Sequence, residues 1–117
     1  MRQSSKVRVA PVSRQYIELE AKLFRGLGDP SRLSILRTLS KAERSVSAIV
    51  KETGLSQPNV SSHLACLREC GLVTFRSEGR SVFYSLADRR LHDILSAAES
   101  ILAGVAERVY DCTRYKA

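Results

Sequence analysis

The fold is decided by residues 45–71, which read SVSAIVKETGLSQPNVSSHLACLRECG. Ser45 or Ser47 can cap a short helix that Gly54 ends, and Ser56 can cap the helix that follows. Proline just inside the start of this second helix and glycine just past its end fit helix boundaries at both places. Two short helices joined by a turn that contains glycine are typical of a helix-turn-helix.

A predicted β-hairpin follows the helical pair. Residues 72–76 (LVTFR) and 81–86 (SVFYSL) are rich in β-branched and aromatic side chains, and residues 77–80 separate them. The order helix, turn, helix, hairpin predicts a mainly α domain with a β-hairpin wing. This is a winged helix-turn-helix, a fold of the α+β class.

Further helices are predicted on both sides of this unit. Residues 14–27 carry apolar side chains at helical spacing, and Asp29 with Pro30 can begin another helix. Residues 88–110 form one long predicted helix with a continuous apolar seam. The seam consists of Leu91, Ile94, Leu95, Ala98, Ile101, Leu102, Val105 and Val109. A chain of 117 residues has little core left to cover it. We therefore expect the first and last helices to form a homodimer interface, with an ordinary core helix as the alternative.

The composition narrows the class of function. The chain has 19 Lys and Arg against 12 Asp and Glu, a net charge of +7. This balance suits a polyanion such as DNA, and a solvated basic surface is the alternative. Apolar stretches are far shorter than the roughly 20 residues of a membrane span, and the N-terminus lacks the apolar region of a secretory signal. We expect a cytoplasmic protein with a flexible basic arm (1–13), a dimeric DNA-binding domain (14–110) and a C-terminal tail (111–117).

The second helix of the pair, from about Ser56 to Cys70, is predicted to read DNA. Its N-terminal end enters the major groove in this class of fold. There Gln and Asn can bond to adenine, and Ser can bond to base edges or phosphates. Arginines at its far end and in the hairpin are expected to hold the flanking phosphates. The predicted DNA-binding residues are Ser56, Gln57, Asn59, Ser61, Ser62, His63, Arg68, Arg76 and Arg80, and Arg2, Lys6 and Arg8 of the arm can add phosphate contacts.

Two of the three cysteines lie on this same helix. Cys66 and Cys70 are four residues apart, so their Cβ atoms are expected about 5–6 Å apart on one face. Two thiolates at that spacing can chelate one soft metal ion, although core or spectator cysteines are the default interpretation. Cys112 follows the last helix, and the tail could bring it to the reading helix of a second protomer.

The span from Leu19 to Leu102 resembles the ArsR/SmtB family of bacterial metal-responsive repressors. The resemblance is carried by LGDPSRLSILRTL (27–39), LSQPNVSSHLACLRECGLV (55–73) and EGRSVFYSL (78–86). It implies a dimeric winged-helix repressor joined through its first and last helices, and not an enzyme.

The metal sites of the family differ between its branches, and their positions in this chain indicate which branch it resembles. One branch carries two cysteines at the third helix, where this chain has Ser45 and Ser47. Zinc sensors carry Asp-x-His early in the last helix, where this chain has Arg90 and His92. The segment HLACLRECGLV (63–73) with one C-terminal cysteine is similar to the CmtR-type branch, which senses cadmium and lead.

The resemblance therefore implies a repressor that binds operator DNA as an apo homodimer and leaves it on metal binding. The implied metal ligands are Cys66, Cys70 and Cys112. Cd(II) or Pb(II) is expected first and As(III) next, because thiolates favour soft ions. Zn(II) is less expected, because structural zinc takes four ligands.

Three other functions would use the same residues. A thiol redox-sensing repressor would pair Cys66 or Cys70 with Cys112 on oxidation. A constitutive DNA-binding module would carry its thiols as spectators. An enzyme would use a Cys–His pair, but His63 and Cys66 have no orienting residue or oxyanion loop beside them, so we expect no catalytic activity.

Overall fold

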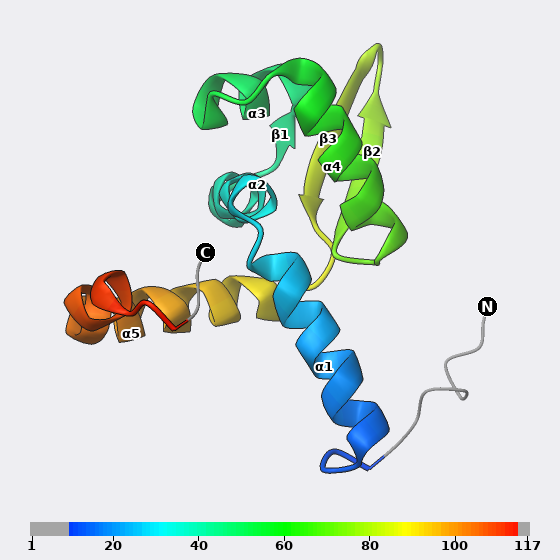
Figure 1. Ribbon diagram of the computed structural model, residues 1–117. Helices are drawn as coiled ribbons and strands as arrows, with labels where there is room; N and C mark the ends of the chain where they lie inside the picture. Colours follow the sequence, from blue (N-terminus) through cyan, green and yellow to red (C-terminus); the bar gives the residue numbers. More distant parts are fainter. Residues whose placement is uncertain (1–9, 115–117) are drawn as a thin grey trace.

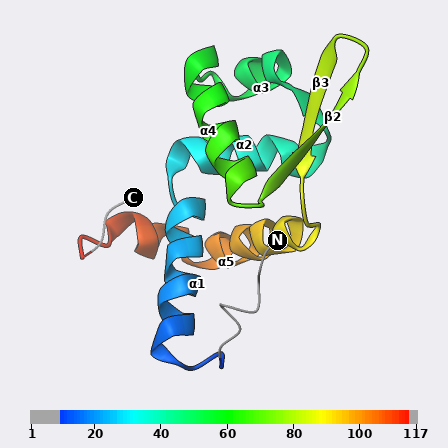
Figure 2. The same ribbon diagram turned by 90° about the vertical axis from the view of Figure 1, so that its right-hand side faces the viewer.

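The computed structural model describes residues 10–114, which fold into five helices and three strands. In chain order these are α1 (Arg14–Leu27), α2 (Pro30–Lys41), β1 (Arg44–Ser45), α3 (Val46–Thr53), α4 (Gln57–Glu69), β2 (Val73–Glu78), β3 (Ser81–Leu86) and α5 (Arg90–Asp111). Figure 1 shows α2, α3, α4 and the β2–β3 hairpin grouped together, with α1 and α5 on the side opposite the hairpin tip. Figure 2 shows the same division after a quarter turn.

Some predictions fall on parts of the chain outside the described residues. These are residues 1–9 of the predicted basic arm, with Arg2, Lys6 and Arg8, and residues 115–117 of the predicted tail. Within residues 10–114, none of the helices combines the length and the apolar character needed to cross a lipid bilayer.

The predicted helix boundaries are confirmed at the start of the chain. The Ser13 hydroxyl accepts a hydrogen bond from the Tyr16 amide at 3.1 Å, which begins α1. The Asp29 carboxylate accepts one from the Arg32 amide at 3.0 Å, and Pro30 occupies the first position of α2. Both caps satisfy backbone amides that have no hydrogen-bond partner within the helix. Proline at the first position of α2 costs no hydrogen bond, because an amide there would have no partner within the helix.

One apolar core joins α2, α3 and α4. Its buried members are Leu27 of α1, Ile35, Leu36 and Leu39 of α2, Ile49 of α3, Val60, Leu64 and Leu67 of α4, Val73 of β2, and Leu91 and Leu95 of α5. The stripe predicted on the reading helix is therefore confirmed, because Val60, Leu64 and Leu67 are each at most 1 % exposed. The opposite face of α4 is thereby left to solvent.

The sheet differs from the sequence prediction in two ways. Residues 77–80 were expected to separate the strands, but β2 continues to Glu78, which pairs with Ser81 of β3. The turn is only Gly79 and Arg80, and Gly79 takes a φ of 61°, which glycine adopts without steric cost. The second difference is β1, which was not predicted. It pairs Arg44 with Tyr84 on β3, so the strand order is β1-β3-β2.

The last helix begins two residues later than the predicted start at Asp88. Asp88 lies outside α5, where its carboxylate accepts a hydrogen bond from the Arg90 amide at 2.9 Å. Only the first part of the seam is buried, through Leu91 and Leu95. Beyond it, Ile101 is 63 % exposed within the single chain.

Candidate nucleic-acid interface and thiol site

The turn between α3 and α4 fixes how α4 is presented. Gly54 ends α3 in a left-handed conformation with φ 76°, and its amide donates to the Val50 carbonyl at 2.9 Å. Ser56 then begins α4, and its hydroxyl accepts a hydrogen bond from the Asn59 amide at 3.3 Å. This left-handed backbone conformation is strained for most residues that carry a side chain, which accounts for glycine at this turn. The geometry is that of a helix-turn-helix.

The predicted DNA-reading side chains lie on the accessible face of α4. Ser56, Gln57, Asn59, Ser61 and Ser62 are exposed, and His63 is half-buried. Because the buried stripe occupies the other face, these polar groups have no role in the core. Their roles toward bases and phosphates stay predictions.

The predicted phosphate-binding arginines have different surroundings. Arg80 is exposed in the two-residue turn at the hairpin tip. Arg68, near the end of α4, places its guanidinium 4.5 Å from the centre of the Phe75 ring. This cation–π contact leaves Arg68 exposed while restricting where its side chain lies.

Arg76 is already engaged within the protein. Its guanidinium donates to both carboxylate oxygens of Glu43, at 2.8 and 2.9 Å, and to Glu78 at 2.6 Å. The hydrogen bonds from Arg76 hold the pKa of Glu43 below its ordinary value. The hydrogen bonds to Glu43 and Glu78 in turn raise the pKa of Arg76. A phosphate contact by Arg76 would have to replace these bonds, so its first role is to tie the hairpin to the segment before β1.

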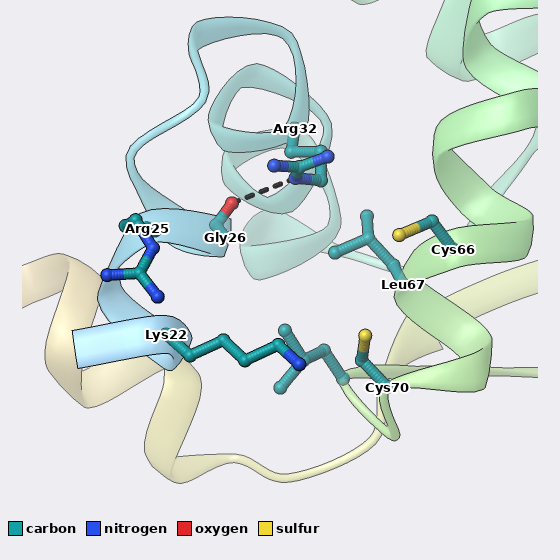
Figure 3. Close-up of a pocket in the computed structure, with 8 residues that line it drawn as sticks. Lys22, Arg25, Gly26, Arg32, Cys66, Leu67 and Cys70 are labelled. Atoms are coloured by element: carbon teal, nitrogen blue, oxygen red, sulfur yellow. Dashed lines mark hydrogen bonds between the residues drawn. The ribbon is translucent and has the colours of Figure 1, made fainter. Parts of the chain in front are cut away.

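The thiols of Cys66 and Cys70 share one cavity between α4 and α1 (Figure 3). Its volume is about 300 Å³, and it is lined by Lys22, Arg25, Gly26, Arg32, Cys66, Leu67, Cys70 and Leu72. Both cysteines are free and exposed. The structure therefore brings two of the three predicted ligands together, one helical turn apart.

Although Cys70 is exposed, partial desolvation beside the cavity raises the pKa of its thiol, and the adjacent Cys66 raises it further, while the Lys22 ammonium acts in the opposite direction. Cys70 is therefore protonated at neutral pH, so a metal ion must displace a proton to bind there.

Cys112 is the C-terminal cap of α5, does not line the cavity of Cys66 and Cys70, and is half-buried. Across residues 10–114 of one chain, no three His, Cys, Asp or Glu side chains are grouped so that they could hold a metal ion. A three-cysteine site therefore needs a second copy of the chain or a movement of the tail.

The positions of the family's other metal sites carry hydrogen-bonded side chains. Ser45 caps α3 by accepting from the Ala48 amide, and its hydroxyl lies 3.2 Å from that of Ser47. His92 places Nδ1 2.6 Å from the Ser40 hydroxyl, which links α5 to α2. These residues thus have structural roles in the single chain.

Sequence reasoning missed the basic side of the thiol cavity. Lys22 and Arg25 lie three residues apart on α1, and Arg32 donates from its Nε to the Gly26 carbonyl at 3.0 Å. Their spacing in the sequence places Lys22 and Arg25 on one face of a helix. That this face lies across from the cysteines becomes visible only once α1 and α4 are placed in space (Figure 3).

Comparison with known proteins agrees with this fold. Residues 29–74 match the family model described as bacterial regulatory protein, arsR family. The chain is 40 % identical over 94 residues to a probable mercury resistance operon repressor of Streptomyces lividans, covering 80 % of this chain and 75 % of that protein. It is 41 % identical over 85 residues to the transcriptional regulator CmtR of Mycobacterium tuberculosis, covering 73 % of this chain and 72 % of that protein.

A solved structure extends the agreement to three dimensions. The crystal structure of Rv0081 from Mycobacterium tuberculosis superposes with a TM-score of 0.74 at 34 % identity, covering 83 % of this chain and 99 % of that one. These relatives are regulators of transcription and not enzymes. With its winged helix-turn-helix and this degree of identity, the chain belongs to the ArsR/SmtB family of metal-responsive bacterial transcriptional repressors.

Proposed function

We propose that the protein is a cytoplasmic repressor that binds operator DNA as an apo homodimer and is released by a thiophilic metal ion. The observation that carries this proposal is the position of Cys66 and Cys70. They lie on the same helix as the predicted DNA-reading residues and open into a shared cavity. A metal ion bound there would act directly on the helix that reads the DNA.

The unpaired apolar surfaces support a dimer through α1 and α5. Exposed apolar side chains on these helices are Ile17, Leu19, Leu23, Phe24, Ile94, Ile101, Leu102 and Val109. Exposed apolar side chains in this number on two helices are typical of an interaction site. A twofold dimer would present two α4 helices to successive major grooves, roughly 34–36 Å apart, and would favour a near-palindromic operator.

The predicted DNA contacts divide into two roles. Gln57 and Asn59 read base edges near the start of α4, with Ser56, Ser61, Ser62 and His63 adding base or phosphate contacts. Arg68 and Arg80 hold the phosphate backbone on either side. Arg76 holds the phosphate backbone only if a phosphate replaces Glu43 and Glu78 as the hydrogen-bond acceptors of its guanidinium.

The donor set favours Cd(II) or Pb(II), then As(III), with Zn(II) less suited. The Cys66 and Cys70 thiols supply two soft ligands, and Cys112 of the second protomer would complete the site as the third. Because one relative is named for mercury resistance, Hg(II) also belongs among the ions to be tested. Two cysteines on one helix turn and a third on a tail fit ions that accept low coordination numbers better than four-coordinate zinc.

Release follows from coupling between the two sites. A metal ion that bridges α4 to the tail of the second protomer would fix the orientation of the reading helices. Metal binding that weakens operator affinity a hundredfold requires about 2.7 kcal/mol of coupling, and operator DNA must weaken metal binding by the same factor. A small reorientation that prevents both half-sites from being contacted together can supply this energy.

The test is fluorescence anisotropy of an operator duplex, first selected by the apo protein from a random pool. Cd(II), Pb(II), Hg(II), Zn(II) and arsenite are added in turn to the protein, to a Cys112→Ser variant and to a Thr113→Ser control. We expect Cd(II) or Pb(II) to release the native protein and the Thr113→Ser control but to leave the Cys112→Ser complex intact. Release of the Cys112→Ser complex at the same metal concentration as the native complex would contradict the proposal.

A thiol redox sensor on the same fold is the second candidate, favoured by the exposure of two free thiols on the reading helix. Oxidation would join Cys66 or Cys70 to Cys112 as a disulfide, with two electrons and two protons passing to the oxidant. Peroxide that releases the protein from DNA without metal, together with a mass spectrum showing that disulfide, would favour this candidate. An unchanged complex after peroxide would exclude it.

A further inference from the structure

The thiol cavity has a basic wall that the proposed chemistry of the cysteines does not use. Lys22 and Arg25, both on α1, line the cavity that holds Cys66 and Cys70. Figure 3 shows the Lys22 amine extending from α1 toward Cys70. Lys22 also lines the adjoining cavity with Leu19, Leu23, Cys70 and Leu72, so it lies at the junction of the two.

The positive charge at this place is only partly explained by the helix itself, since Arg25 lies in the last turn of α1, where a cation suits the helix dipole. Arg32 is tied to the Gly26 carbonyl, which joins α2 to the end of α1. None of the hydrogen bonds or ion pairs found within residues 10–114 uses the side chain of Lys22 or Arg25. Glu69, the residue before Cys70, carries a negative charge that opposes them.

The ions that suit three thiolates form thiolate complexes of different net charge. Cd(II) displaces three protons from three thiols and gives a complex with a net charge of −1, and Pb(II) does the same. Arsenite, as As(OH)₃, condenses with three thiols, releases three waters and gives a neutral complex. No electron is transferred in either reaction. A cation beside the sulfur atoms therefore stabilises the first kind of product and not the second.

We propose that Lys22, assisted by Arg25, makes the cysteine site selective for ions whose thiolate complex is anionic. The inference rests on the proposed metal site and adds a specificity determinant on α1. It also ties metal binding to α1, the helix whose apolar face we assign to the dimer. The two residues act through charge and are not metal ligands.

The expected effect is modest, because Lys22 and Arg25 are exposed and water screens them. Replacing Lys22 by glutamine should weaken Cd(II) binding roughly two- to fivefold, the scale of a solvent-screened charge pair. Arsenite binding should change by less than about twofold, because its complex carries no net charge for the ammonium to stabilise. At about 1 M salt, where the Debye length is about 3 Å, the difference for Cd(II) should shrink.

The experiment titrates Cd(II) and arsenite into the full chain, follows the ultraviolet thiolate-to-metal band, and uses a competing chelator or dithiol to obtain affinities. The variants are Lys22→Gln, Arg25→Gln and the conservative Lys22→Arg, with Lys51→Gln as the control because Lys51 is an exposed lysine on α3. Far-ultraviolet circular dichroism checks that each variant folds.

Support for the proposal is a loss for Cd(II) alone in Lys22→Gln, with normal binding in Lys22→Arg and Lys51→Gln. Equal losses for both ions would show that Lys22 acts only through packing, and no loss for either would remove its role. Absence of the thiolate band in the native protein is a different failure. It would overturn the proposed metal site itself.

Discussion

Dimer formation through α1 and α5 predicts a large effect from one substitution on the apolar seam, Ile101→Ala. Ile101 is 63 % exposed in the single chain, so a partner helix would bury most of its side chain. The substitution removes three carbons, each worth about 0.8 kcal/mol when fully buried, and scaling by the exposed fraction gives about 1.5 kcal/mol per protomer. A twofold dimer contains the contact twice. The dissociation constant should therefore rise roughly 150-fold, from about 3 kcal/mol of lost burial.

The assay is sedimentation velocity over a dilution series, which separates dimer from monomer and yields the dissociation constant. Val82→Ala is the matched control, because Val82 is also an exposed aliphatic residue, 36 % exposed, but lies on the hairpin. It should leave dimerisation unchanged. A native protein that remains monomeric at high concentration, or an Ile101→Ala dimer as tight as the native one, would refute the assignment of this interface.

Two further predictions concern the ends of helices. Ser56→Ala removes the hydroxyl that accepts from the Asn59 amide at the start of α4, so the free energy of unfolding should fall by about 1 kcal/mol. Thermal unfolding should show a shift of about 4 °C, and an unchanged midpoint would argue against this cap. Hydrogen bonds from Arg90 lower the pKa of Asp88 from 3.8 to about 2. A depressed carboxyl pKa stabilises the fold above the unfolded value and loses that effect as pH falls through the folded one. Native protein and Asp88→Asn should therefore differ in melting temperature at neutral pH and converge between about pH 4 and pH 2, whereas a pH-independent difference would contradict this.

Helices were readable from the sequence because their signals are local. The spacing of apolar residues gave the extent of α1, which spans Arg14–Leu27 as predicted. Serine and glycine at the ends of α3 and α4 mark groups that each helix must satisfy at its termini. Such signals depend on side chains within one turn of the boundary, so no tertiary information is needed.

The sheet was less readable because pairing is a property of two segments. A strand of two residues such as β1 has no alternation to detect, and its partner Tyr84 lies 40 positions away in the chain. Ser77 and Glu78 have low strand propensity, yet they continue β2 because the glycine turn brings Val82 and Ser81 opposite them. Tertiary pairing here overrides local preference.

The candidate site shows the same limit. The spacing of Cys66 and Cys70 places them on one face of a helix, and the structure finds them in one cavity. The basic wall opposite them depends on how α1 crosses α4, which no local pattern encodes. Arg76 was predicted to contact phosphate from its position alone, whereas the structure shows it held by Glu43 and Glu78.

The most direct test of whether DNA reading and metal binding share α4 is the affinity of Cd(II) for the protein free and bound to operator DNA. The ultraviolet thiolate-to-metal band reports metal binding, and the same samples give operator affinity by anisotropy. The prediction is that DNA weakens Cd(II) binding by the factor by which Cd(II) weakens DNA binding, on the order of a hundredfold. Equal Cd(II) affinity with and without DNA, together with operator binding that ignores Cd(II), would contradict it and leave α4 as a DNA-reading helix whose thiols take no part in release.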